Sequence, residues 1–145
     1  MILINKDRSY PIIHKHYPGR QGQPMTEQEI HEFGIELLIV YLYKQKGNLI
    51  SANHNRLSEY PNLVVKNPDN KLLYVWIETK ISPNIPFYNE DEHHKEKQDL
   101  ANKFNAIPVF AGIVLSGYPS DENFIPLCGG KYIAEFTGFK AIYIG

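Results

Sequence analysis

Two segments of this chain are apolar on both faces when extended, and this constrains the fold more than any other feature of the sequence. In residues 72–81, LLYVWIETKI, alternate side chains project from opposite faces of a strand, and both sets are apolar as far as Ile77. Residues 107–117, IPVFAGIVLSG, repeat this pattern. Such strands have to be covered on both sides, as in sheets with helices on each face. The sequence therefore predicts the α/β class.

Two helices are expected around these strands. Thr26 followed three residues later by Glu29 is typical of a capping box, and it predicts a helix over residues 26–46. This helix is almost entirely apolar in its second half, which indicates that it is buried. A second helix over residues 90–105 separates the two doubly apolar strands, so that they become parallel neighbours.

The remaining strands are shorter. A four-residue turn with Pro68 and Asp69 at its centre is expected to join a strand over 62–66 to the strand over 71–81. In the hairpin that results, position 59 lies opposite Glu78. Thr137 and Gly138 predict the turn of a closing hairpin. The strands expected besides the two doubly apolar ones cover residues 48–54, 62–66, 131–136 and 139–145.

Length and composition define the broad class. The 145 residues suit a single domain over 1–145, in which residues 1–25 form an irregular arm rich in proline and glycine. One cysteine, Cys128, leaves no internal disulfide and no cysteine cluster for zinc. No segment is typical of a secretory signal or a membrane span, so a cytoplasmic protein without a membrane partner is expected.

Charge restricts the partners. A formal net charge of −1 excludes an overall positive field, so contact with DNA or RNA has to be local. The arm is the local exception, because it can follow a phosphate backbone. Alternatively, it packs on its own domain or on a second subunit of a homodimer. Its basic residues are Lys6, Arg8, Lys15 and Arg20.

Glu78 and Lys80 are the charged pair that could carry chemistry. They stand two residues apart on an otherwise apolar strand, so both side chains project from the same face. A phosphodiester hydrolase needs carboxylates to hold a divalent cation and a positive group to steady the developing charge. The pair supplies one of each. The alternative is a solvated ion pair at a strand end.

The order of helix, three-stranded meander ending in Glu-x-Lys, helix and buried strand resembles the PD-(D/E)XK, or restriction-endonuclease-like, superfamily. FGIELLIVYLYKQKGNLISANHN is similar to the opening helix and first strand of small bacterial members related to Holliday-junction resolvases, and VWIETK is similar to the strand that delivers the acid and the lysine. The resemblance implies an α/β/α sandwich with a central mixed sheet. It also implies that Glu36 assists a site that binds Mg²⁺ or Mn²⁺.

The sequence departs from the family at the first acidic position. Asp69 cannot fill it, because about nine residues of strand at ~3.3 Å each place it about 30 Å from Glu78. Two alternatives stay open. Asn62 lies in the matching context EYPNLVV, and Glu59 has the charge and lies opposite Glu78 in the simplest register. The implied metal ligands are therefore Glu78 with Asn62 or Glu59.

Two functions follow from these residues. The first is a metal-dependent nuclease that cleaves the nucleic-acid backbone, with Glu78, Lys80 and Glu36 as catalytic residues. The second is a catalytically impaired nuclease-fold domain that binds nucleic acid or protein. Glu78 and Lys80 favour the first hypothesis, whereas Asn62 and the near-neutral charge favour the second.

Overall fold

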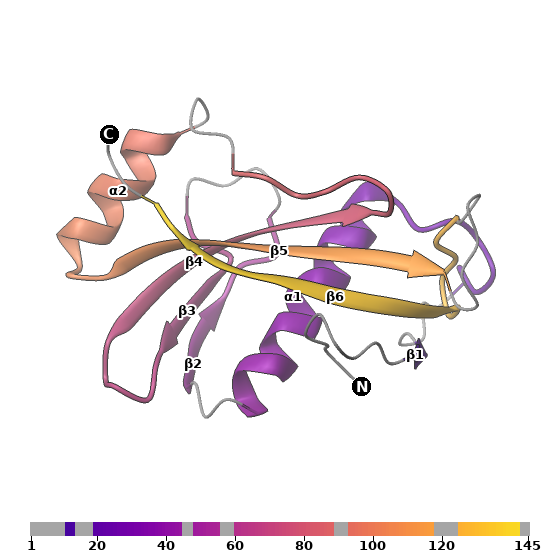
Figure 1. The fold of residues 1–145 in the computed structure, drawn as a ribbon, viewed down its shortest axis with the longest axis horizontal. Coiled ribbons are helices and arrows are strands. Elements are labelled where there is room, and N and C mark those ends of the chain that lie inside the picture. Colours follow the sequence, from indigo (N-terminus) through magenta and orange to yellow (C-terminus); the bar gives the residue numbers. More distant parts are fainter. Residues whose placement is uncertain are drawn as a thin grey trace.

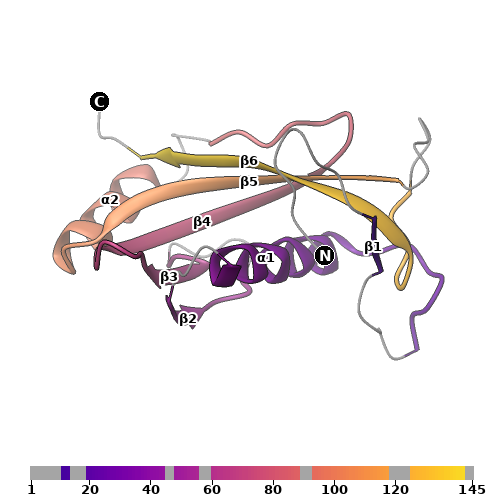
Figure 2. The ribbon, with the colours of Figure 1, turned by 60° about the horizontal axis from the view of Figure 1, so that its bottom comes forward.

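The fold is a six-stranded mixed sheet with helices on both faces, described here from a computed structural model (Figures 1 and 2). The strand order is β1-β6-β5-β4-β3-β2, in which only β4 and β5 are parallel. The described residues are 11–13, 19–44, 48–55, 60–88, 93–117 and 125–142. The elements are β1 (Pro11–Ile13), α1 (Glu27–Lys44), β2 (Asn48–Ala52), β3 (Leu63–Lys66), β4 (Leu72–Ile81), α2 (His94–Lys103), β5 (Ile107–Gly117) and β6 (Lys131–Ala141).

The central strand β4 is buried on both faces, as its sequence predicted. Val75 and Ile77 belong to a large core beneath α1, whereas Tyr74 and Trp76 belong to a smaller core beneath α2. In Figure 2, α1 lies under the sheet, while α2 lies at one end of the opposite face. The expected α/β class with a central mixed sheet is confirmed, including the parallel pair of doubly apolar strands.

Helix α1 begins at the capping box that the sequence indicated. The Thr26 hydroxyl accepts a hydrogen bond from the Glu29 amide at 3.1 Å, and the Glu29 carboxylate accepts one from the Thr26 amide at 2.8 Å. Both donors would otherwise lack a partner in the first turn. The helix then buries Ile35, Leu38 and Leu42 against the sheet.

Gly34 sets how closely α1 approaches β4. A Cβ atom at this position would collide with the side chain of Thr79 on β4. Only glycine therefore allows the helix to lie this close to the strand. Because Thr79 contacts α1, the neighbouring side chains of Glu78 and Lys80 project from the other face of β4.

The turn between β3 and β4 differs from the expected one. Pro68, Asp69 and Asn70 form a three-residue loop closed by the hydrogen bond from the Asn67 amide to the Lys71 carbonyl oxygen. Asn70 adopts a positive φ of 64°, which asparagine tolerates better than most residues. The extra loop residue shifts the register, so that Leu63 pairs with Val75. The expected register would instead pair position 62 with Val75.

The expected closing hairpin is wrong, because β6 is one continuous strand from Lys131 to Ala141. Its register with β5 shifts by one residue, since Ala111 pairs with Phe139 whereas Ile113 pairs with Phe136. Thr137 and Gly138 therefore form a β-bulge opposite Gly112, and Gly138 has a φ of 101°. The Thr-Gly pair that predicted a turn instead bends a strand.

The N-terminal region is less irregular than its prolines and glycines suggested. β1 pairs with the beginning of β6 and forms one edge of the sheet. Residues 19–25 lie against 125–130, where Gly22 and Met25 donate backbone hydrogen bonds to the carbonyl oxygens of Cys128 and Pro126. Within the described ranges, no helix combines the length and the apolar character needed to cross a membrane.

The close approach of α1 gives a stability prediction. Gly34→Ala should lower the free energy of unfolding by about 1–3 kcal/mol, because the new methyl group overpacks the contact with Thr79. Thr79→Ala alone should cost little, since the buried Thr79 hydroxyl has no hydrogen-bond partner among the described residues. Urea unfolding of both single variants and the double variant measures the coupling. If Thr79→Ala does not recover part of the stability lost through Gly34→Ala, the contact between residues 34 and 79 does not set how closely α1 approaches β4.

Candidate functional site

Glu78 and Lys80 lie together near the carboxyl end of β4. In the parallel register, Glu78 is level with Gly112 and Lys80 with Val114 of β5. The Lys80 Nζ atom is 3.7 Å from Glu78 Oε1, and the two side chains are 45% and 35% exposed. The structure therefore brings these two residues into one accessible ion pair.

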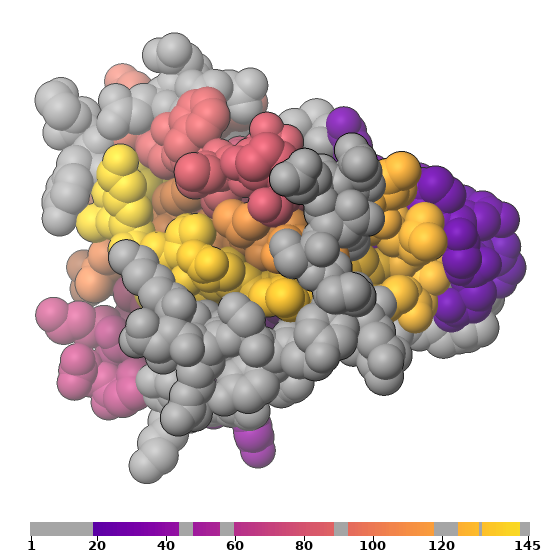
Figure 3. Space-filling model, turned by 45° about the vertical axis from the view of Figure 1, so that its right-hand side comes forward, coloured from indigo at the N-terminus to yellow at the C-terminus, as the bar shows by residue number. Residues whose placement is uncertain are grey.

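Gly112 allows the chain to fold over this face beside the pair. A Cβ atom there would collide with Pro86, from the segment that follows β4, and with the hydroxyl oxygen of Thr137 on β6. That hydroxyl donates a hydrogen bond to the Gly112 carbonyl oxygen at 3.1 Å. In Figure 3, the pink segment after β4 lies against the orange and yellow atoms of β5 and β6. One side of the pair is thus bounded by a covering segment.

Glu36 lies elsewhere. It is half-buried on α1, two residues after Gly34. At ~100° per residue, Glu36 is about 200° around the helix from the side that touches Thr79. The structure therefore directs Glu36 away from the sheet, while Glu78 projects from the face of the sheet opposite α1. These two carboxylates are not brought together.

Asn62 is buried, with 4% of its surface exposed, and its amide joins three segments. The side-chain oxygen accepts a hydrogen bond of 2.8 Å from the Ile77 amide on β4. The side-chain nitrogen donates to the carbonyl oxygens of Asn53 and Asn55, after β2, at 3.1 and 3.2 Å. Asn62 therefore continues the sheet beyond β3 by means of its side chain.

His31 is a buried polar residue that the sequence analysis did not single out. It is 3% exposed on α1, and its Nε2 atom is 3.4 Å from the side-chain nitrogen of Asn62. His31 precedes Gly34, Ile35 and Leu38 at helical spacing, so the 3.6-residue period could have placed it on the buried side. The sequence contained no signal that Asn62 was its neighbour.

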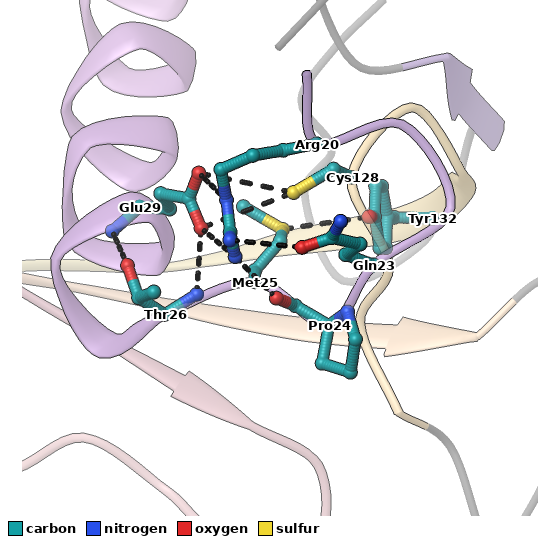
Figure 4. Close-up of polar contacts among 8 residues, drawn as sticks. All are labelled: Arg20, Gln23, Pro24, Met25, Thr26, Glu29, Cys128 and Tyr132. Atoms are coloured by element: carbon teal, nitrogen blue, oxygen red, sulfur yellow. Dashed lines mark hydrogen bonds and ion pairs between the residues drawn. The ribbon is translucent and has the colours of Figure 1, made fainter. Parts of the chain in front are cut away.

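Arg20 is the only proposed nucleic-acid contact that falls among the described residues, and it packs on its own domain (Figure 4). Its guanidinium group forms two hydrogen bonds with the Glu29 carboxylate, at 2.9 and 3.0 Å. The Cys128 thiol donates to the same carboxylate at 3.8 Å. The positions of Lys6, Arg8, Lys15 and Glu59 lie outside the described residues.

The Arg20–Glu29 pair changes the titration of both groups. The hydrogen bonds from Arg20 hold the pKa of the Glu29 carboxyl below its usual value, and those to Glu29 raise the pKa of Arg20. Nearby, burial raises the pKa of Tyr132 to about 12, so its hydroxyl stays neutral and donates to the Met25 sulfur at 3.4 Å. These contacts hold residues 20–25 against α1 and against the segment before β6.

No group of three or more histidine, cysteine or acidic side chains converges on a common metal position in the described part of the chain. Glu78 is the one proposed metal ligand there that carries a carboxylate.

A family model described as a domain of unknown function, DUF8840, matches residues 28–142. The chain belongs to this family. The matched region of the DUF8840 domain starts in the first turn of α1 and includes every later element, whereas Arg20 and β1 precede it. The Arg20–Glu29 pair thus ties the preceding segment to the DUF8840 domain. No curated protein and no solved structure is significantly similar to the chain.

The ion pair in Figure 4 gives a pH prediction. Arg20→Met should lower stability near neutral pH, because Glu29 loses its charged partner. A carboxyl whose pKa is depressed by folding contributes stability above its ordinary pKa, about 4.3, and loses that contribution as the pH falls through the folded value. The difference between wild type and variant in urea unfolding should therefore shrink below about pH 4.3. The exposed residue Lys95 provides a control, since Lys95→Met should show no such trend.

Proposed function

We propose that this domain keeps a restriction-endonuclease-like architecture and acts as a binding module for nucleic acid or protein, with impaired nuclease chemistry. The order α1, three-stranded meander, α2 and β5 supports the architectural part of the proposal. The meander ends in Glu78 and Lys80 at a central strand, as the resemblance implies. The proposed loss of nuclease chemistry depends on which residue occupies the position of the family's first acidic metal ligand.

The observation that carries the proposal is the hydrogen bonding of Asn62. Its nitrogen donates to two carbonyl oxygens, and its oxygen already accepts from Ile77. An ionised aspartate has no hydrogen to donate, and it would place a negative charge beside those carbonyl oxygens. The amide therefore favours a structural role here over metal binding, which needs negatively charged oxygen ligands for tight affinity.

Glu78 and Lys80 suit a binding role as well. An exposed pair of this kind contributes only about 0–1 kcal/mol to stability. Both groups are accessible, so each can give up its contact with the other and pair with an opposite charge on a partner. This change costs little free energy. The pair would then select partners by charge arrangement more than by strength of binding.

Asn62→Asp tests the proposal. The substitution should lower the free energy of unfolding by about 1–3 kcal/mol or more, because two hydrogen bonds are lost and a buried charge is introduced. It should not create cleavage of supercoiled plasmid DNA with Mg²⁺ or Mn²⁺. The exposed Asn84 offers a matched control, since Asn84→Asp should leave stability unchanged. A stable Asn62→Asp protein that cleaves DNA and binds metal in calorimetry would overturn the proposal.

A second candidate function is the metal-dependent nuclease, favoured by the accessible position of Glu78 and Lys80 on one face of a central strand. Glu78 would then hold Mg²⁺ or Mn²⁺, which would activate water, and Lys80 would steady the charge that develops on the phosphate. Among the described residues, Glu78 brings the only carboxylate of the proposed ligands and lies beside an ammonium group, which fits such an ion poorly, because hard cations prefer several anionic oxygens.

The nuclease candidate makes its own prediction. Wild-type protein should cleave plasmid DNA slowly with Mn²⁺, and Glu78→Gln and Lys80→Met should each abolish this without unfolding the domain, because both side chains are partly exposed. Lys95→Met serves as the matched control for Lys80→Met, since Lys95 is also exposed. Cleavage that survives in Glu78→Gln would exclude this candidate. Gel analysis of plasmid topology, with circular dichroism to check folding, makes the measurement.

A further inference from the structure

A groove lies at the amino ends of β4 and β5, where the turn between β3 and β4 and the end of α2 lie at the same end of the sheet (Figure 1). Eight residues of strand at ~3.3 Å each separate Leu72, which lines the groove, from Lys80, about 26 Å. The volume of about 540 Å³ is within the range of ligand sites. The groove is therefore a site separate from the Glu78–Lys80 pair. Its lining residues are Ile50, Lys66, Asn70, Lys71, Leu72, Phe104, Asn105 and Ile107.

Lys66, Leu72 and Phe104 lie on the face of the sheet that α2 covers. Lys66 pairs with Leu72 across the hairpin, and residues that pair in this way project from the same face. Leu72 packs against the smaller core beneath α2. Phe104 follows α2, and its ring centroid lies 6.3 Å from that of Tyr74 in the same core. One ligand on this face can therefore contact both Lys66 and Phe104.

The ring of Phe104 offers a platform for stacking. Phe104 is 52% exposed, although Tyr74 supports its ring from the core. The Lys103 ammonium group lies 5.7 Å from the centroid of the Phe104 ring. Every nucleobase can stack on an aromatic ring, and positive groups beside the ring attract the phosphates of the same strand. A base on Phe104 would thus bring its phosphate close to Lys103.

The groove is locally positive, although the whole chain has a formal net charge of −1. Lys66 and Lys71 line it, and none of the described lining residues is acidic. Lys66 is half-buried on β3, whereas Lys71 is exposed in the turn before β4. Neither lysine forms an ion pair with another described residue. An anionic ligand would therefore meet positive charge that these residues do not neutralise among themselves.

We propose that this groove binds a single-stranded segment of nucleic acid. One base would stack on Phe104, while neighbouring phosphates would contact Lys66 and Lys71. The side-chain amides of Asn70 and Asn105, which also line the groove, each offer a donor and an acceptor to the edges of the bases. The apolar lining of Ile50, Leu72 and Ile107 adds surface for the rest of the base.

Two other anionic partners suit the groove less well. A duplex keeps the faces of its bases stacked on one another, so it has no base face to place on Phe104. An acidic peptide would satisfy Lys66 and Lys71, but its carboxylate side chains have no extended planar group for the ring. The exposed ring beside the lysines therefore favours an unpaired strand over both.

The probe for this site is a fluorescein-labelled oligothymidylate of twelve nucleotides. Its binding to the full chain is measured by fluorescence anisotropy in EDTA, which prevents metal-dependent cleavage. We expect it to bind at least tenfold more tightly than the same strand in a duplex, and than a peptide of alternating glutamate and valine. Equal binding of the duplex or the peptide overturns the proposal. So does thymidine triphosphate that binds as tightly as the strand, because the groove would then be a site for a free nucleotide.

Substitution of Phe104 tests the stacking. Phe104→Ala should weaken binding of the strand at least fivefold, because one base loses its platform. Phe104→Trp should retain binding, since the larger ring still stacks. The matched control is Phe87→Ala, which removes a ring that is 68% exposed and does not line the groove. Equal weakening by the two alanine variants, or none by Phe104→Ala, overturns the proposal, provided that circular dichroism shows both variants folded.

The salt dependence of binding tests the phosphate contacts. Each contact with a phosphate of a single strand contributes ~0.7 to the slope of log affinity against log salt concentration. Lys66→Met combined with Lys71→Met should therefore reduce this slope by about 1.4. The matched control combines Lys95→Met with Lys140→Met, because these residues are exposed, lie outside the groove and change the net charge equally. A slope that the groove variant leaves unchanged, or that both variants reduce equally, overturns the assignment of the phosphate contacts to this groove.

This inference rests on the proposed function in that it takes nucleic acid as the partner of the binding module. The two can fail separately, because the groove variants leave Asn62 untouched. DNA cleavage gained by Asn62→Asp would overturn the proposed function and leave the strand-binding result standing. Absence of binding by the oligothymidylate would overturn the groove assignment and leave the role of Asn62 intact.

Discussion

The structure depends on the burial of both faces of β4 and β5. Because these strands are apolar on each side, one face requires α1 and the other requires α2 together with the segment after β4. Charged side chains on these strands can reach solvent only where the cover ends. Glu78 and Lys80 stand at that boundary, so their position follows from the packing of the core and does not by itself require a catalytic role.

The parts of the fold that the sequence predicted are those with a strong repeating pattern. Burial on both faces of residues 72–81, the capping box at Thr26 and the parallel pairing across α2 were all predictable from residue spacing. The wrong predictions fall at positions where one backbone dihedral angle decides between two local structures. Thr137 and Gly138 fit a turn or a bulge equally well, and Asn70 added one residue to a loop. Local sequence does not distinguish these cases, because the partner strand selects between them.

The candidate site shows a similar limit. The sequence placed Glu78 and Lys80 together correctly, because two residues on one strand share a face. It could not foresee how Asn62 is bonded, since the partners of its amide come from β4, from the segment after β2 and from α1. In the sequence, Asn62 resembles a metal ligand that has lost its charge. In the fold, its side chain continues the hydrogen bonding of the sheet beyond the end of β3.

The two edges of the sheet differ, and this difference determines what any assembly can look like. On one side the chain adds its own short strand, β1, which begins with a proline and offers little further backbone for pairing. On the other side, β2 pairs only with β3 among the described residues. Two copies that paired through β2 would each use up this edge, so the assembly would close at two chains and would not grow further on that side.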